Sequence, residues 1–144
     1  MSEAAEEQRE VIEGEGYAAG NIDGMGEGWG FRKIRKELGV NEMGVNAVVM
    51  PPGYEAGFHF HDEQEEVYIV LSGLIRFTFG DKSQIVLGPG GVARVDAATH
   101  RKFANAGEGD ATYVCFGAKG GYVGRDGRSP EGENPRPDGP PGAQ

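Results

Sequence analysis

The sequence predicts an all-β protein whose strands form a sandwich or a barrel, with little helix. Glycine accounts for 26 of the 144 residues, a share far above the roughly 7% of ordinary proteins, which favours many turns. Short runs of β-branched and aromatic residues recur about every 8–12 residues, separated by turn-forming residues. No stretch shows the 3.6-residue apolar period of an amphipathic helix. Together these observations favour short strands connected by tight turns.

The predicted strands end at recognisable turn signals. The run 43–50 stops at Pro51-Pro52-Gly53, and the run 84–87 stops at Gly88-Pro89-Gly90-Gly91. Residues 29–38 are a possible additional opening strand. In chain order the predicted strands are 43–50, 58–61, 66–71, 74–79, 84–87, 92–95, 100–103 and 111–116.

Composition divides the chain into three zones. Residues 1–16 hold six Glu and one Arg and are expected to be partly disordered. Residues 124–144 contain five of the eight prolines and no hydrophobic residue larger than Ala, so they bury too little apolar area to offset the entropy of ordering. We therefore expect a barrel domain over 17–123 and a tail over 124–144 that is disordered or lies loosely on the surface.

Charge and cysteine content exclude several classes of protein. The net charge is −9, and no basic face is available for a nucleic-acid backbone. No apolar run approaches the roughly 20 residues that span a membrane, and the first residues are acidic where a signal peptide is basic and then apolar. The single cysteine, Cys115, excludes an internal disulfide and fits a reducing compartment. We predict a cytoplasmic protein that binds neither nucleic acid nor membrane.

The predicted strand 66–71 is apolar on both faces. Val67, Ile69 and Leu71 face one side, while Tyr68 and Val70 face the other side together with Glu66. A strand that is apolar on both faces must be covered on both, and a small barrel has only one interior. The N-terminal strand or a second subunit would have to cover the outer face, and we predict a homodimer.

Two of the three histidines lie at alternate positions of one short predicted strand. The imidazoles of His59 and His61 therefore project to the same face. Glu66 begins the next strand, and pairing across the short link 62–65 brings its carboxylate near both rings. Two imidazoles and a carboxylate on one face suit non-haem iron, and also zinc, nickel or manganese. The alternative is a polar strand end with solvated histidines.

A longer pattern surrounds these three residues. It consists of Gly53, five residues, His59-Phe60-His61, four residues, Glu66, six residues and Gly73. The pattern resembles the first signature motif of the cupin superfamily at every anchor position, and the resemblance covers about residues 40–118. It implies a small single-domain cupin of the type-2 kind, with a double-stranded β-helix (jelly-roll) barrel that often dimerises. It also implies a divalent metal ion held by His59, His61 and Glu66.

The second cupin motif is only partly present. Gly90 and Asn105 match the family pattern, whereas Asp96 and Ala98 replace the expected proline and glycine. At the position of the third metal-binding histidine the chain has Arg101. His100 adjoins it, but neighbours on a strand point to opposite faces.

Three arrangements follow from this arginine. In the first, the two histidines and Glu66 bind a metal ion with water, and the Arg101 guanidinium attracts an anionic ligand beside the open position. In the second, Arg101 pairs with Glu66 and replaces the metal. In the third, a one-residue bulge brings His100 into the barrel and restores the usual ligand set.

The sequence therefore suggests a polar site with few candidate ligand contacts. Tyr68 shares the face of Glu66, where its hydroxyl either binds a ligand or packs in the core; with Arg101 and His100 it completes the candidate substrate-binding residues. The leading hypothesis is a small metal-binding cupin-like protein that binds or transforms a small polar metabolite. The alternatives are a non-catalytic ligand-binding module and a metal-free isomerase in which His59 or His61 is the general base.

Overall fold

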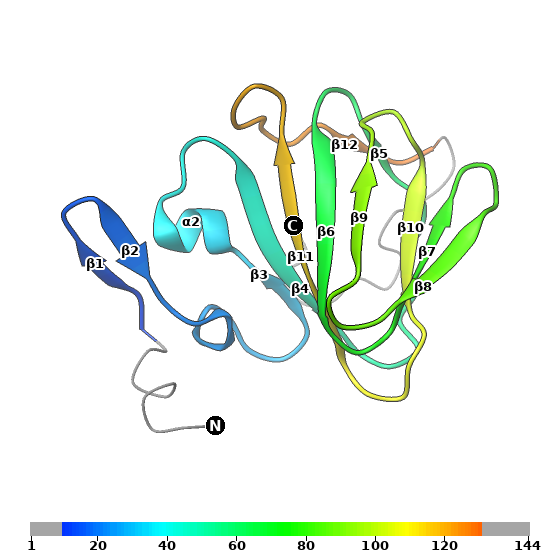
Figure 1. Ribbon diagram of the computed structural model, residues 1–144, viewed down its shortest axis with the longest axis horizontal. Helices are drawn as coiled ribbons and strands as arrows, with labels where there is room; N and C mark the ends of the chain where they lie inside the picture. The colour runs from blue at the N-terminus through cyan, green and yellow to red at the C-terminus, as the bar shows by residue number, and fades with distance from the viewer. Residues whose placement is uncertain (1–9, 131–144) are drawn as a thin grey trace.

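A computed structural model describes residues 10–130 and confirms the all-β class. Its two main sheets have the strand orders β3-β4-β11-β6-β9 and β10-β7-β8, and two short ribbons pair β1 with β2 and β12 with β5 (Figure 1). The elements are β1 (Ile12–Gly14), β2 (Tyr17–Ala19), 3-10 helix η1 (Ile22–Gly24), β3 (Gly30–Arg32), α2 (Ile34–Leu38), β4 (Gly44–Met50), β5 (Phe60–His61), β6 (Glu65–Ser72), β7 (Ile75–Phe79), β8 (Gln84–Leu87), β9 (Val92–Val95), β10 (Arg101–Asn105), β11 (Ala111–Ala118) and β12 (Gly127–Arg128).

The predicted strands from residue 43 onward are confirmed, with small shifts of their ends. The predicted strand 58–61 is half as long as expected, because only Phe60–His61 is regular strand. Its preceding residue, His59, forms an isolated antiparallel bridge with Arg101. This bridge connects the two-stranded ribbon at the end of the barrel to the first residue of β10.

The prediction of a possible opening strand over 29–38 is wrong for most of that segment. Only Gly30–Arg32 is strand, and Ile34–Leu38 forms the short helix α2. The residues between Ile34 and Leu38 are good helix formers. The helix then ends at Gly39, whose φ of 72° is the left-handed conformation that glycine adopts readily at a helix C-terminus.

The core lies between the two main sheets and is rich in aromatic side chains. The predicted facing of β6 is confirmed, because Glu66, Tyr68 and Val70 are buried whereas Val67 and Leu71 are exposed. Both sheets contribute buried side chains to one cluster, which consists of Val48, Met50, Tyr68, Val70, Ile75, Phe77, Val95, Phe103, Ala111 and Tyr113.

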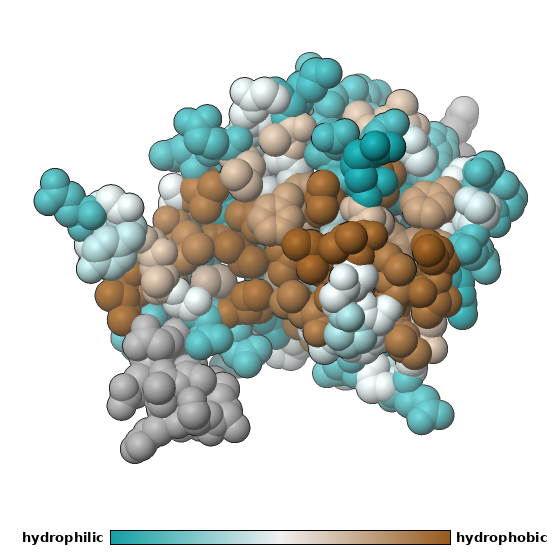
Figure 2. Space-filling model, in the orientation of Figure 1, coloured by the Kyte–Doolittle hydropathy of each residue, from teal (hydrophilic) through white to brown (hydrophobic). Residues whose placement is uncertain are grey.

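The outer face of the larger sheet is covered over only part of its width. Ile34 of α2 packs with buried residues of β4 and β11, namely Val45, Ala47 and Val114, and so covers that part of the sheet. Farther along, Val67 and Val92 remain 37% and 63% exposed. Apolar residues form a broad area on this side of the molecule (Figure 2). The N-terminal region therefore supplies part of the cover that the sequence requires.

Short strands lie at both ends of the described chain. The boundary expected at residue 16 falls inside the hairpin of β1 and β2, while residues 1–9 and 131–144 lie outside the described residues. Residues 127–128 of the predicted tail form β12, which pairs with β5. The helices among residues 10–130 are too short and too polar to cross a bilayer.

Candidate metal centre

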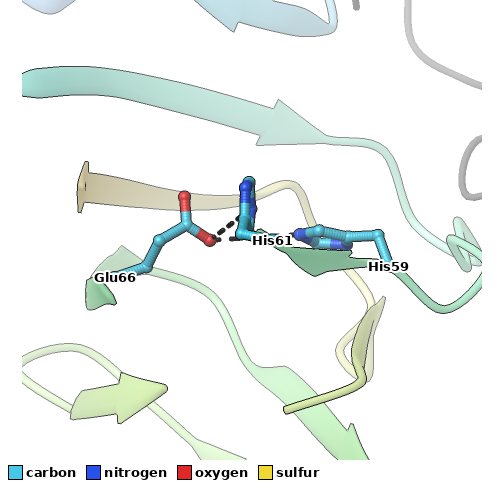
Figure 3. Close-up of side chains that lie close together, drawn as sticks. All are labelled: His59, His61 and Glu66. Atoms are coloured by element: carbon cyan, nitrogen blue, oxygen red, sulfur yellow. Dashed lines mark ion pairs between the residues drawn. The ribbon is translucent and has the colours of Figure 1, made fainter. Parts of the chain in front are cut away.

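Three predicted ligands converge at one end of the barrel. His61 lies in β5, His59 directly precedes it, and Glu66 lies near the start of β6. One ligand atom from each residue can be chosen so that all lie within 4.8 Å of one another (Figure 3). Among the described residues, this is the one group of three or more metal-ligating side chains so arranged.

Glu66 is the centre of this group. Its Oε1 lies 3.0 Å from His61 Nε2 and 4.0 Å from His59 Nε2, and it accepts a short hydrogen bond from the Tyr68 hydroxyl. Burial would raise the pKa of the Glu66 carboxyl, but the nearby imidazoles of His59 and His61, the charge of His61 and the Tyr68 hydroxyl hold this pKa well below its usual range. The residue is therefore a carboxylate at neutral pH.

The two ring nitrogens of His61 differ in their hydrogen bonding. Its Nδ1 lies 2.7 Å from Oδ1 of Asp126, a hydrogen-bond distance. Its Nε2 is buried and makes no hydrogen bond to a described residue, although it lies 3.0 Å from Glu66 Oε1, which is an ion-pair distance when the ring is protonated. Burial would lower the pKa of His61, but the Glu66 and Asp126 carboxylates outweigh it and raise the pKa above its ordinary value.

His59 offers the second imidazole. Its ring lies edge-on to His61, with centroids 5.2 Å apart, and edge-on to Phe103 at 5.6 Å. Burial lowers the pKa of His59, and the nearby Arg101 and His61 lower it further against the opposing effect of Glu66. The ring is therefore neutral at physiological pH, which is the form that ligates metal ions.

Arg101, which stands where the sequence resemblance implies a third metal-binding histidine, contacts Glu66 directly. Its side chain is 0% exposed, and its Nη2 lies 3.0 Å from Glu66 Oε1. Its Nη1 donates to three backbone carbonyls, at 2.6 Å to Thr99, 3.2 Å to Ala97 and 3.4 Å to Asp96. The ion pair of the second predicted arrangement is thus present. Arg101 is not among the residues that line the cavity.

His100 is not brought into the group. The pairing of β10 with β7 runs from Arg101 to Asn105 without a register shift, so the bulge of the third predicted arrangement is not observed. The ring of His100 instead stacks on Phe60, with centroids 4.7 Å apart and planes at 12°. Its predicted role in ligand binding stays a prediction that this position does not support.

Tyr68 lies where the sequence predicts, against the cavity and beside Glu66. The residue is only 2% exposed, and its hydroxyl donates to Glu66 and accepts from Arg101 Nε at 3.4 Å. Burial, and then the neighbouring Cys115 and Glu66, raise the pKa of Tyr68 well above its ordinary value. Its hydroxyl therefore stays protonated and acts as a hydrogen-bond donor.

Asp126 is the residue that sequence reasoning missed. It belongs to the predicted tail, 65 residues after His61, and no motif connects the two. Its oxygens also accept from Gln64 Nε2 at 2.6 Å and from the backbone N–H of Glu63 at 2.7 Å. Gly117 provides the room for Gln64, because a Cβ there would collide with the Gln64 side chain.

A cavity of about 380 Å³ opens onto the group. Its polar wall includes His59, His61, Glu66 and Tyr68, and its apolar wall includes Phe103. Residues 122–128 close another side, and we call this segment the C-terminal strap. The volume falls within the range of small-molecule sites, which are concave and mostly apolar with a few directed polar groups.

The donor set fits a divalent metal ion. Two imidazoles and one carboxylate are the residue types that bind first-row transition metals, and a metal would satisfy the buried Nε2 of His61. Arg101 opposes the binding of a metal cation, because its guanidinium group is already paired with Glu66 Oε1. Burial, and then the Glu66 carboxylate, raise the pKa of Cys115 well above its ordinary value, so its thiol remains protonated and is a poor ligand.

Solved structures with similar folds carry different functions. A cupin protein from Bacteroides fragilis is 22% identical with a TM-score of 0.58, over 69% of this chain and 82% of that chain. A sugar phosphate isomerase from Silicibacter pomeroyi is 25% identical with a TM-score of 0.57, over 62% of this chain and 58% of that chain. The DMSP lyase DddQ from Ruegeria pomeroyi is 22% identical with a TM-score of 0.56, over 64% and 46%.

The match with these structures shows the fold of this chain. The chain covers less than two thirds of the length of the isomerase and of the lyase, and no curated protein matches it. The family model described as the cupin domain matches residues 46–117, which include the three converging ligands and Arg101. The chain belongs to the cupin family.

Proposed function

We propose that this protein binds a divalent transition-metal ion through His59, His61 and Glu66 and holds a small polar ligand in the adjoining cavity. The observation that carries the proposal is the buried Nε2 of His61, which has no hydrogen-bond partner while the other ring nitrogen is held by Asp126. A buried polar atom without a partner is costly in a folded protein. A metal ion would remove that cost and offset the charge of Glu66.

The metal would act as a Lewis acid that polarises an oxygen of the bound ligand. The protein's own residues orient the site: Arg101 holds Glu66 by an ion pair, and Tyr68 donates to the same carboxylate. Phe103 contributes to the apolar wall of the cavity. Zinc, iron, nickel and manganese all suit these donors.

A second question is whether the protein transforms its ligand, as an enzyme, or only binds it. The similar structures include a sugar phosphate isomerase and a DMSP lyase, and one fold hosts many chemistries. The predicted contacts of Arg101 and Tyr68 with ligand remain proposals, and the lining position of Tyr68 supports only the second. A screen for turnover, with ligand-induced thermal stabilisation as the parallel readout, separates an enzyme from a binding module.

A metal-free barrel is the second candidate. The 3.0 Å contact between Arg101 and Glu66 favours it, because the guanidinium already balances the buried carboxylate. In that case neutral His59 would be available as a general base facing the cavity. The two candidates differ in one property, the amount of metal that the protein retains.

Metal content of untagged protein tests the proposal. After growth and dialysis with zinc, iron, nickel or manganese, elemental analysis should find close to one equivalent of one of these ions. His59→Ala and His61→Ala should each abolish it, whereas His100→Ala should retain it because that ring lies outside the group. A metal content below about 0.1 equivalent in the wild type would refute the metal proposal and favour the metal-free barrel.

The homodimer and the cytoplasmic location remain proposals. Val67 and Val92 are apolar and exposed on the outer face of β6 and β9, which supports a partner at that face. Light scattering of the wild type should give the mass of two chains, and Val92→Lys should give the mass of one. A monomeric wild type would remove the dimer from the proposal.

A further inference from the structure

Asp126 accepts hydrogen bonds on both carboxylate oxygens. Oδ2 accepts from the backbone N–H groups of Glu63 and Gln64, at 2.7 and 3.1 Å. Oδ1 lies 2.7 Å from His61 Nδ1 and accepts from Gln64 Nε2 at 2.6 Å. Backbone N–H groups can only donate, so Oδ2 is an acceptor, and Oδ1 already accepts from Gln64, so both oxygens of Asp126 act as acceptors.

The bond between Asp126 and His61 therefore has one possible direction. A carboxylate cannot donate, so Nδ1 of His61 must carry the proton and donate it. In the neutral ring the other nitrogen, Nε2, then carries the lone pair. This nitrogen is the buried, unpartnered atom that faces Glu66.

The C-terminal strap brings Asp126 to this position through several contacts. Its strand β12 pairs Gly127 with His61 and Arg128 with Phe60. Arg128 Nε also lies 2.9 Å from Asp62 Oδ2, in an ion pair whose side chains are 65% and 42% exposed. This exposed ion pair joins the strap to the barrel without touching the imidazole, which makes it a suitable comparison for Asp126.

We infer that Asp126 is a positioning residue of the metal centre: it selects the tautomer and the ring orientation of His61 that direct Nε2 toward Glu66. The inference rests on the proposed function for the metal, but its effect on the ring is a property of the metal-free protein as well. A carboxylate behind a ligating histidine is a general means of raising the affinity of the imidazole for a metal ion. Because coupling is reciprocal, metal binding should in turn stabilise the docked strap.

Asp126→Asn tests this assignment sharply. The two backbone N–H groups that face Oδ2 require an acceptor there, so the amide oxygen of Asn should occupy that place. The amide NH₂ would then face His61 Nδ1 and donate to it, and Gln64 can turn its own oxygen toward the amide. We expect the His61 proton to move to Nε2, where it would block the metal.

Two measurements follow from this expectation. Imidazole ¹⁵N–¹H spectra of the metal-free protein, recorded where the ring is neutral, should show the proton of His61 on Nδ1 in the wild type and on Nε2 in Asp126→Asn. Titration with Co²⁺ or Zn²⁺ in competition with a chelator should show about 10–100-fold weaker binding by the variant. Asp62→Asn removes an exposed ion pair of the same strap and should change both readouts little.

Each result has a defined meaning. A wild-type His61 with its proton on Nε2, or an Asp126→Asn variant with unchanged tautomer or affinity, would overturn the inference. Equal weakening by Asp62→Asn would assign the effect to docking of the strap and would overturn it too. A wild type that binds neither cation would refute the proposed function, whereas the tautomer measurement would still decide the role of Asp126. The wild-type spectrum needs no variant, so poor folding of Asp126→Asn leaves the test intact.

Discussion

The barrel interior has a polar region around Glu66 and an aromatic region around Phe77, which we call its polar and apolar ends; they meet at Tyr68 and Phe103 and are stabilised in different ways. At the apolar end, Phe103 of β10 packs against Phe77 at a centroid distance of 5.2 Å and against Tyr113 at 5.5 Å. At the polar end, Arg101 of the same strand donates to Glu66 and to three backbone carbonyls. The same strand, β10, therefore contributes aromatic packing at the apolar end, and an ion pair and hydrogen bonds at the polar end.

This difference determines how each end responds to the loss of an atom. Neighbours of a deleted methyl group can relax into the space, so the cost in free energy is graded. A buried charged or polar group that loses its partner keeps its full desolvation cost. Substitutions at the polar end should therefore cost more than substitutions of similar size at the apolar end.

The largest effect is expected for Arg101→Ala. It would leave the buried Glu66 carboxylate without its cation, and the free energy of unfolding should fall by about 3–5 kcal/mol. If Arg101 takes the place of a metal charge, zinc should stabilise this variant more than it stabilises the wild type. Urea denaturation with and without zinc measures both quantities.

The matched control is Arg94→Ala. Arg94 pairs with Asp96 at 3.3 Å, but both side chains are about two-thirds exposed, and exposed ion pairs contribute little. Its removal should leave the unfolding curve essentially unchanged. Equal zinc stabilisation of Arg101→Ala and the wild type would contradict the idea that the guanidinium substitutes for a cation.

A smaller effect is expected for Tyr68→Phe. The change removes the hydroxyl that donates to Glu66 and leaves the ring packed against Phe77 and Phe103. Loss of a buried hydrogen bond to a charged group should lower the free energy of unfolding by about 1.5–3 kcal/mol, as measured by urea denaturation. Tyr122→Phe makes the same chemical change at a 43% exposed position and should have no measurable effect; similar losses in both variants would refute the special role of the Tyr68 hydroxyl.

The smallest of these effects belongs to the apolar end. Ile75 is 0% exposed, and Ile75→Val should lower the free energy of unfolding by about 0.5–1.5 kcal/mol. Ile85→Val is the matched control, because Ile85 lies on the neighbouring strand β8 and is 48% exposed. Thermal or urea unfolding of the two variants compares the loss of a buried methyl group with the loss of an exposed one. A loss from Ile75→Val larger than that from Tyr68→Phe would reverse the expected order of the two ends.

Local alternation in the sequence was sufficient to predict the strands and the direction of several side chains. The period of two places Tyr68 on the face of Glu66 and places His59 and His61 on one face of their strand. The short link between them and Glu66 makes their convergence a local event. For the same reason the sequence correctly orients Val67 and Leu71 outward.

Helix α2 shows the limit of such local reasoning. The helix Ile34–Leu38 has only five residues, and its two apolar residues are too few to define a period that distinguishes strand from helix. The left-handed Gly39 that ends the helix was the local signal available. Its meaning depends on where the chain turns next, which is a property of the packed barrel.

Taken by itself, the sequence determined the strands and the convergence of His59, His61 and Glu66, because residue spacing along a strand sets the face to which each side chain points; the cupin barrel followed from the resemblance of this motif to the family pattern. Only the tertiary structure decided the partner of Arg101, the outward position of His100 and the contact of Asp126 with His61. These pairings join segments that are distant in sequence, and their hydrogen bonds exist only when the sheets and the C-terminal strap have packed together.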